Sequence, residues 1–279
     1  MLPHFLVIGA QKSGTTSLYR LLGRHPEMVR ARHKELHFFD REHARGRRWY
    51  ERQLPSPLRV LARRLRGRRT ICGEATPAYL ALPDVPARVR ALLPDVRLVA
   101  LLRDPTRRAI SQYHHRVRNH GESRPIAEVL GAELLRAAQG GESSLPPLGY
   151  IARGHYAGQL ERWLAHYPRA QMLVLPAEPF YADPAPTVRR VADFVGLGSL
   201  DPRRYAGTFR VRHAGRYAAP PADLVARLDA HFAPHNERLL ALLGSDFEAS
   251  SWAPWRVERH PIRPSPTETS SLAPESRPS

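Results

Sequence analysis

The stretch FLVIGAQKSGTTSLYRLL, Phe5 to Leu22, decides the fold of this chain. Its first four residues form an apolar run that ends in a glycine, as expected for a buried strand. Leucines then recur at helical spacing from Leu18 to Leu22. The order strand, glycine-rich loop, helix predicts a phosphate-binding unit of an α/β protein.

The loop itself, GAQKSGTT from Gly9 to Thr16, differs from the P-loop of nucleoside triphosphatases. That motif places lysine directly after its second glycine, whereas Lys12 lies inside this loop and Thr15 follows Gly14. We expect Gly14, Thr15 and Thr16 at a helix N-terminus, where unpaired N–H groups and the helix dipole bind an anion. The motif predicts a phosphate site but leaves open which phosphate it holds.

Composition bounds the class of protein. The chain has 279 residues, 42% of them hydrophobic, which suffices for one substantial core. Its 43 Lys and Arg against 26 Asp and Glu give a net charge of +17, so an anionic ligand, an acidic substrate and a nucleic acid are all candidate partners, and composition alone does not choose among them. Without an apolar run of about 20 residues or a basic leader, we expect a soluble cytoplasmic protein. The single cysteine, Cys72, excludes an intrachain disulfide, and we expect it to be structural and no metal to be bound.

Lysine is confined to two positions, Lys12 and Lys34, in a chain with 41 arginines. These positions favour sites that need a compact ammonium charge, with chance as the alternative. Lys34 opens the stretch KELHFFD, in which Glu35 and His37 would point the same way on an extended segment. A glutamate there can accept a proton from a hydroxyl and a histidine can donate to developing negative charge, although a charged surface loop is equally compatible.

A second strand-to-helix unit is RLVALLRDPTRRAISQYHH, with an apolar run from Leu98 to Leu102. Asp104 is suited to cap the following helix and Pro105 to begin it. Arg103, at the carboxyl end of the strand, and Ser111, two helical turns later, can meet one phosphate. A structural salt bridge is the alternative for Arg103. The alternation of strands and helices predicts an α/β fold with a central parallel sheet flanked by helices, P-loop-like in plan.

Four motifs, GAQKSGTT, KELHFFD, GEATPAYL (Gly73 to Leu80) and LLRDPTRRAISQY, carry a resemblance to a known family. In order and spacing they are similar to sulfotransferases that use 3'-phosphoadenosine 5'-phosphosulfate (PAPS). The chain most resembles the heparan sulfate glucosaminyl 3-O branch and its bacterial relatives, from about residue 4 to residue 247. The resemblance implies that the loop binds the 5'-phosphosulfate of PAPS, that 3',5'-diphosphoadenosine is the product, and that no metal is needed.

The resemblance also implies roles for individual residues. Lys12 would stabilise the departing 5'-phosphate, Glu35 would be the general base, and Lys34, His37 and Asp40 would surround the transferred group and the acceptor hydroxyl. The cofactor site would comprise Lys12, Ser13, Gly14, Thr15, Thr16 and Ser17, with Arg103 and Ser111 on the 3'-phosphate. Substrate binding would fall to Glu74, Thr76, Pro77 and Tyr79.

The C-terminal half agrees with the family in part. In HAGRYAAP, Gly215 and Arg216 match a loop that closes over PAPS, but Ala214 stands where the family has lysine. Helices are expected for GHYAGQLERWLAHYP and from Ala222 to Leu243, the latter interrupted near Pro234. We expect one sulfotransferase domain over residues 1–255 and a disordered tail rich in Pro, Ser and Thr over 256–279.

The sequence thus predicts transfer of a sulfuryl group to a hydroxyl, or as second choice an amine, of a carbohydrate or small molecule that can be anionic. Two alternatives are a P-loop nucleotide kinase or NTPase and a basic nucleic-acid-binding protein, but neither shows its motif. The segment Arg45 to Arg69 holds ten arginines and one acid, Glu51. It is interpreted either as a grip for an anionic acceptor or as a solvated helix. Trp49, Tyr50 and Tyr79 either stack on an acceptor or belong to the core. The oligomeric state is not predicted.

Overall fold

A computed structural model describes residues 1–141, 146, 149–198, 219–244 and 247. At its centre lies a five-stranded sheet of order β2-β3-β1-β4-β5, in which every pair of neighbours is parallel. The strands are β1 (Phe5–Gly9), β2 (Met28–Arg30), β3 (Ile71–Ala75), β4 (Arg97–Leu102) and β5 (Met172–Pro176). The predicted parallel α/β sheet is confirmed, with all carboxyl ends at one edge.

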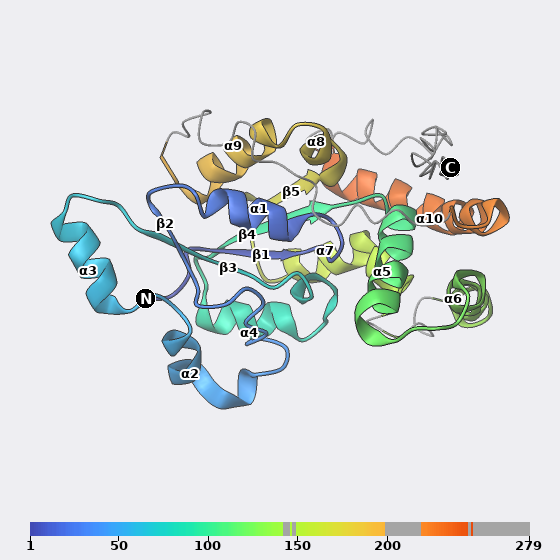
Figure 1. Ribbon diagram of the computed structural model, residues 1–279, viewed down its shortest axis with the longest axis horizontal. Coiled ribbons are helices and arrows are strands. Elements are labelled where there is room, and N and C mark those ends of the chain that lie inside the picture. Colours follow the sequence, from blue (N-terminus) through green and yellow to red (C-terminus); the bar gives the residue numbers. More distant parts are fainter. Residues whose placement is uncertain (142–145, 147–148, 199–218, 245–246, 248–279) are drawn as a thin grey trace, which may run out of the picture.

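Helices cover both faces of this sheet and extend beyond its carboxyl edge (Figure 1). The α-helices are α1 (Thr15–Leu22), α2 (Gly46–Arg52), α3 (Pro57–Leu65), α4 (Val85–Leu92), α5 (Pro105–His120), α6 (Ile126–Gly140), α7 (Tyr156–Leu164), α8 (Ala177–Ala182), α9 (Pro184–Val195) and α10 (Ala222–Leu243). Short 3-10 turns are η1 (His43–Arg45), η2 (Tyr79–Ala81), η4 (Ala152–Gly154) and η5 (Arg169–Gln171). Helices α1 and α9 pack together on one face.

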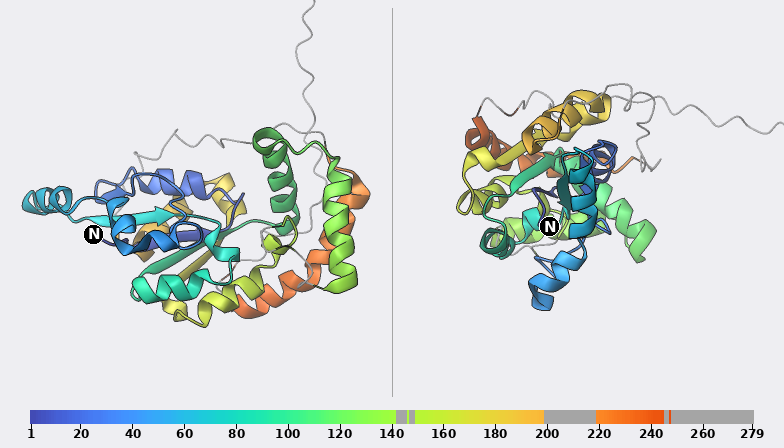
Figure 2. Two further views of the ribbon diagram at one scale, coloured as in Figure 1. Left: turned by 90° about the horizontal axis from the view of Figure 1, so that it is seen from below. Right: turned by 90° about the vertical axis from the view of Figure 1, so that its left-hand side faces the viewer.

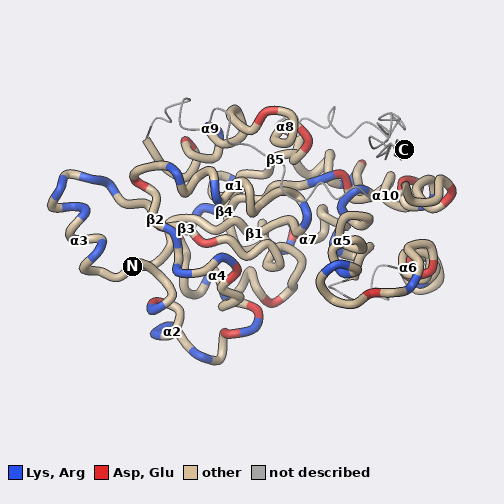
Figure 3. The backbone as a smooth tube through the Cα atoms, viewed as in Figure 1, with Lys and Arg blue, Asp and Glu red and all other residues tan. Residues whose placement is uncertain are grey.

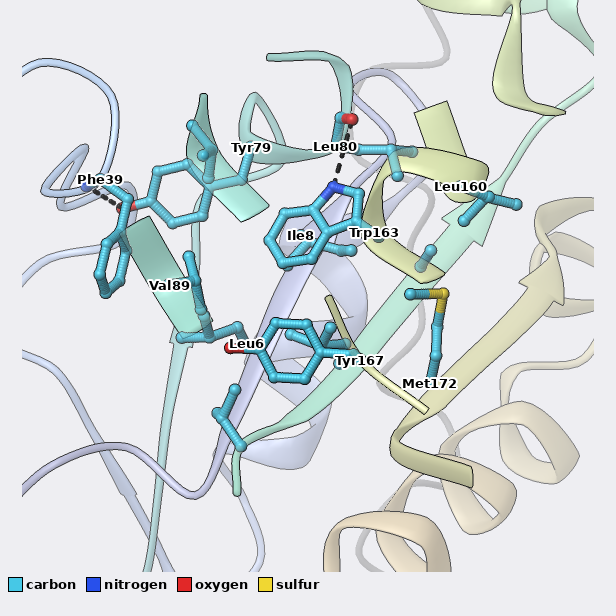
Figure 4. Packing of buried hydrophobic residues seen from close by; sticks show 14 of the residues in the cluster. Leu6, Ile8, Phe39, Tyr79, Leu80, Val89, Leu160, Trp163, Tyr167 and Met172 are labelled. Carbon is cyan, nitrogen blue, oxygen red and sulfur yellow. Dashed lines mark hydrogen bonds between the residues drawn. The ribbon is translucent and has the colours of Figure 1, made fainter. Parts of the chain in front are cut away.

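Strand β1, and β4 after Arg97, are apolar throughout because both faces of these strands are buried. Phe5 and Val7 of β1 pack with α1 and α9, whereas Leu6 and Ile8 point to the opposite face. On that opposite face the fully buried Trp163 of α7 donates its indole N–H to the carbonyl of Leu80, at 3.3 Å (Figure 4). These contacts hold β1 and the neighbouring strands in place at the carboxyl edge of the sheet, where the loops after β1 and β4 begin.

A third apolar cluster joins α5, α6 and α10 beside the carboxyl edge of the sheet. Helix α10 is continuous through Pro234, so the interruption expected there is wrong. Proline removes one helical hydrogen bond, but Phe232 before it and Leu239 after it are both buried, so tertiary packing holds the two halves in one helix. The fully buried Arg108 donates to Gln112 Oε1 and to the carbonyl of Tyr150, which ties α5 to the loop before α7.

Three further expectations concern the cysteine, membrane-spanning helices and the domain boundary. Cys72 is buried in β3, where burial raises the pKa of its thiol to about 12, as suits a structural residue. None of the helices in the described ranges is long and apolar enough to span a membrane. The expected domain boundary at 255 and the tail 256–279 lie outside the described residues.

Candidate active site

The loop between β1 and α1 has the backbone of an anion site. Gly14 precedes the first residue of α1 with φ 85°, a left-handed conformation that favours glycine. A Cβ at Gly14 would lie 2.9 Å from Cε1 of Tyr181, so the ring of Tyr181 closes against this glycine. Ser17 and Leu18 make the first helical hydrogen bonds, to the carbonyl of Gly14, and Thr15 and Thr16 precede them. The predicted placement at a helix N-terminus is confirmed, with first-turn N–H groups available to an anion.

Two side chains of the loop are withdrawn from solvent, Ser13 fully and Lys12 in part. Ser13 is fully buried, and its Oγ has no hydrogen-bond partner. Burial, with repulsion from Arg118 and Arg103, lowers the pKa of Lys12 to about 8, and Glu35 acts in the opposite direction. Lys12 therefore lies within electrostatic range of both arginines and of Glu35. Because Arg118 comes from the far end of α5, the sequence did not single it out.

Arg103 follows β4 and reaches across to the loop. Its Nη1 donates to the carbonyl of Lys12 at 3.3 Å, and its guanidinium lies 5.5 Å from the centre of the Tyr181 ring. Tyr181 also donates its hydroxyl to the carbonyl of Lys12, at 3.4 Å, and Tyr156 donates to the carbonyl of Arg103, at 2.9 Å. The Nε of Arg103 is buried without a partner. Arg103 is thus held on the loop and is not part of a salt bridge within the described residues.

The start of α5 is fixed as predicted. Asp104 accepts from the amide of Arg107 at 2.8 Å, and Pro105 is the first residue of the helix. The sequence did not predict the role of Glu178, which accepts from the amide of Asp104 at 2.9 Å. Burial raises the pKa of Glu178. Ser111 is half-buried two turns into α5, and its role stays a prediction.

The segment after β2 brings the predicted acid and base groups together. Lys34 Nζ contacts Glu35 Oε1, His37 Nε2 lies 3.6 Å from Glu35 Oε2, and His37 Nδ1 lies 2.8 Å from Asp40 Oδ2. The expected extended conformation is wrong, because φ is 63° at Glu35 and 53° at His37. The left-handed turns are supported by the amide of Glu35, which donates to the carbonyl of Ala75 at 2.9 Å. Such strained positions cluster at functional sites.

The charges of this segment follow from its contacts. Burial alone would raise the pKa of Glu35, but hydrogen bonds and attraction from His37 and Lys34 outweigh it and lower the pKa to about 2. Hydrogen bonds to Asp40 and Glu35 raise the pKa of His37 to about 9. At neutral pH the segment therefore presents an ionised Glu35 beside a protonated His37.

The residues predicted to bind substrate from GEATPAYL lie mostly inside the protein. Glu74 is fully buried on β3 and accepts from the hydroxyls of Tyr50, Thr76 and Tyr79, the last two at 2.9 Å. Tyr79 also accepts from the amide of Phe39, at 3.3 Å (Figure 4). In this conformation these side chains contact the protein and support the segment that carries Glu35, so direct substrate binding stays a prediction.

The structure shows where Tyr50 and Pro77 lie, but it does not describe Gly215 and Arg216. Tyr50 is buried and stacks on Phe38 with ring centres 4.3 Å apart, so of the two alternatives it belongs to the core. Pro77 lines a small hollow of about 10 Å³ with Gln11, Arg153 and Gln159. Gly215 and Arg216 lie outside the described residues, so their predicted contact with the nucleotide is not tested.

Three histidines form a separate cluster between the start of α7 and α10. The nitrogen atoms of His155, His231 and His235 lie within 4.8 Å of one another, with 2.9 Å between Nε2 of His155 and Nε2 of His231. Burial, with repulsion from the neighbouring rings, lowers the pKa of His155 to about 3 and that of His231 to about 4. Neutral imidazoles at this spacing can share an N–H···N hydrogen bond, and they are also the residues here that could hold a metal ion.

A parallel sheet with a lysine-containing loop at a helix N-terminus, a strand-end arginine and a glutamate at the next strand end is the arrangement expected of an enzyme that acts on an anionic, phosphorylated ligand. The comparisons define the class more closely. The model of the Sulfotransferase domain family matches residues 2–209, so the chain belongs to that family.

The relatives agree with this assignment. Mouse heparan sulfate glucosamine 3-O-sulfotransferase 3B1 is 38% identical over 196 residues, which is 70% of this chain and 46% of that protein. The human 3-O-sulfotransferase 6 is 32% identical over 269 residues, 88% of this chain and 73% of that protein. A crystal structure of a sulfotransferase from Alicyclobacillus acidocaldarius is 31% identical with a TM-score of 0.66, and covers 90% of this chain and 99% of its own. Kinase, NTPase and nucleic-acid alternatives are not favoured.

Proposed function

We propose that this enzyme transfers the sulfuryl group of PAPS to a hydroxyl of a carbohydrate acceptor. The observation that carries the proposal is the placement of Lys12 and Glu35 at the carboxyl ends of two paired strands. Lys12 follows β1, and the amide of Glu35 donates to the carbonyl of Ala75, the last residue of the neighbouring β3. The Lys12 ammonium can stabilise the charge on the leaving phosphate, and the Glu35 carboxylate can accept the proton of the acceptor hydroxyl. In-line transfer of the sulfuryl group places it between these two residues.

The residues present fit the donor. Ser13 Oγ and Arg103 Nε are buried polar atoms without protein partners, and each can bond to a phosphate or sulfate oxygen. Arg118, Arg103 and Lys34 each lower the pKa of Lys12, so Lys12 lies in a cationic environment that suits a ligand with several negative charges. We assign Ser13 to Ser17 and Lys12 to the phosphosulfate, and Arg103 with Ser111 to the 3'-phosphate.

The chemistry divides between the two sides of the site. As the acceptor oxygen bonds to sulfur, the bond from sulfur to the bridging oxygen breaks and Lys12 stabilises the charge left on that oxygen. Glu35 takes the acceptor proton. In the free enzyme its carboxylate is held by Lys34 and His37, so the acceptor hydroxyl exchanges for one of these partners. His37, held by Asp40, then donates to the acceptor.

The names of the relatives suggest where to look for the acceptor. Two of them are heparan sulfate glucosamine 3-O-sulfotransferases, so we propose a glucosamine-containing glycan, with its hydroxyl preferred to its amine. Cytoplasmic location stays a proposal from the sequence alone.

Calorimetric titration with 3',5'-diphosphoadenosine, and with ATP in the presence and absence of magnesium, tests the donor site. We expect tight, magnesium-independent binding of the diphosphate, weakened in Arg103→Ala. A preference for magnesium-ATP would refute the proposal.

Single-turnover transfer from PAPS to heparan sulfate tests the roles of the acid residues. Glu35→Gln should lower the rate by about 10²- to 10⁴-fold, the usual contribution of general base catalysis, while diphosphate binding is retained. Glu42→Gln is the matched control, because Glu42 lies nearby but pairs only with the exposed Arg45 among the ion pairs of the described residues. A wild-type rate in Glu35→Gln would remove Glu35 from the mechanism.

A further inference from the structure

Helix α3 stands apart from the site at the opposite end of the molecule. It precedes β3 and lies at the amino edge of the sheet (Figures 1 and 2). Lys12 and Arg103 follow β1 and β4, so they lie at the carboxyl edge. Val60, only 6% exposed, packs inward, and Arg63 donates to the carbonyl of Pro26. The helix is therefore held by one side. Because α3 lies at the opposite edge of the sheet, the arginines of α3 have no role at the reacting atoms.

The outward side of α3 carries a leucine stripe, defined as Leu58, Leu61 and Leu65. These side chains are 78%, 52% and 79% exposed and lie three and four residues apart, on one face of the helix. Three of the five large apolar side chains that are exposed among the described residues belong to this stripe. A contiguous exposed apolar stripe on a helix marks an interaction surface.

Cationic side chains border the stripe. Exposed arginines around it are Arg59, Arg64, Arg66, Arg68 and Arg69. The sequence has no acidic residue between Glu51 and Glu74 to balance them, and Figure 3 shows the resulting run of positive charge along α3 and the segment that follows it. Next to the helix, Arg64, Arg68 and Arg69 line an open hollow of about 510 Å³ together with His4. The hollow has the size and charge for a phosphate-bearing head group.

We propose that α3 docks on an anionic lipid surface, with the leucine stripe inserted at the boundary of the acyl chains and the arginines on the lipid phosphates. An apolar stripe flanked by arginine on a helix of low overall hydrophobicity is the pattern of interfacial helices. A sulfated glycan would satisfy the arginines but leave three leucines in water, so the combination favours lipid. In this orientation the carboxyl edge of the sheet faces away from the membrane and the site stays open to solution.

Vesicle co-sedimentation tests the proposal. The full chain is mixed with vesicles of phosphatidylcholine alone or of phosphatidylcholine with phosphatidylglycerol, at low and high salt. We expect binding to the anionic vesicles only. The double variant Leu58→Ser/Leu65→Ser should lower the partition coefficient by about tenfold or more, as expected for the loss of two inserted leucines. Leu135→Ser, which removes a leucine of α6 that is 56% exposed, should leave it unchanged.

Three outcomes would overturn the proposal. The first is that the protein binds neither kind of vesicle. The second is that the double variant binds as the wild type does, which would attribute vesicle binding to the net charge of the chain alone. A concentration-dependent dimer that the double variant abolishes, without vesicle binding, would assign the stripe to a second copy of the chain. Retained binding of 3',5'-diphosphoadenosine in every variant shows that they are folded and keeps this test separate from the test of the donor site.

Discussion

Replacing Gly14 with alanine tests whether the loop before α1 binds the donor. The substitution forces an L-residue to adopt φ 85°, which costs about 1–2 kcal/mol of stability. It also places Cβ 2.9 Å from Tyr181 Cε1, so the ring must move. The moved ring loses its hydrogen bond to the carbonyl of Lys12, about 0.5–1.5 kcal/mol, and its contact with the guanidinium of Arg103, about 0.5–2 kcal/mol.

Because Tyr181 then no longer holds Lys12 and Arg103 in place, Gly14→Ala should weaken binding of 3',5'-diphosphoadenosine by about 1–3.5 kcal/mol, or about 5- to 400-fold. The assay is calorimetric titration beside thermal denaturation. Gly67→Ala is the matched control, because φ is 68° there and nothing lies within 4 Å of the added Cβ, far from the site. It should lose stability and keep affinity. If Gly14→Ala binds as the wild type does, or if both variants lose affinity equally, the assignment of the loop to the phosphosulfate is refuted.

Three further predictions concern titratable groups that are fully or partly buried. Tyr50→Phe removes a hydroxyl donor from the buried Glu74 and should lower the free energy of unfolding by about 1.5–3 kcal/mol in chemical denaturation; an unchanged midpoint would contradict this. Because the pKa of His37 is raised to about 9, the stabilisation it contributes is complete below pH 6.5 and is lost as pH rises through 9, so His37→Gln should flatten this alkaline decline in thermal denaturation. The pKa values of His155 and His231 are lowered to about 3 and 4, so their effect on the pH dependence of stability is opposite to that of His37. The stabilisation should be complete above pH 6.5 and fall on acidification toward pH 4, and the fall should be shallower in His231→Gln. A flat profile in the wild type would show that these rings are not held neutral.

The sequence predicted the central sheet and the loop well because their signals are local. The apolar run of β1, the glycine at the start of α1 and the cap at Asp104 each depend on neighbours in the chain, and each has its predicted place. Pro234 shows the limit of such reasoning, because long-range packing on both sides of it decides that α10 continues.

The contacts that complete the site are long-range, so the sequence pattern did not contain them. Tyr50 and Glu74 are 24 residues apart, and Tyr181 is 169 residues from Lys12, whose carbonyl accepts its hydroxyl. The left-handed turns at Glu35 and His37 were missed for a related reason, since glycine was the only signal for positive φ and neither residue is glycine. Only the folded chain shows that β3 supplies the carbonyl that supports this turn.

Because lysine occurs at only two positions, amine-reactive labelling of this chain reports on the candidate site. Both primary amines of the side chains, Lys12 and Lys34, belong to the candidate site, and an amine-reactive reagent would otherwise meet only the N-terminus. Because the pKa of Lys12 is lowered to about 8, a large share of this amine is uncharged, and so nucleophilic, under mildly alkaline conditions. Labelling followed by mass spectrometry can therefore follow ligand occupancy directly, before any acceptor has been identified.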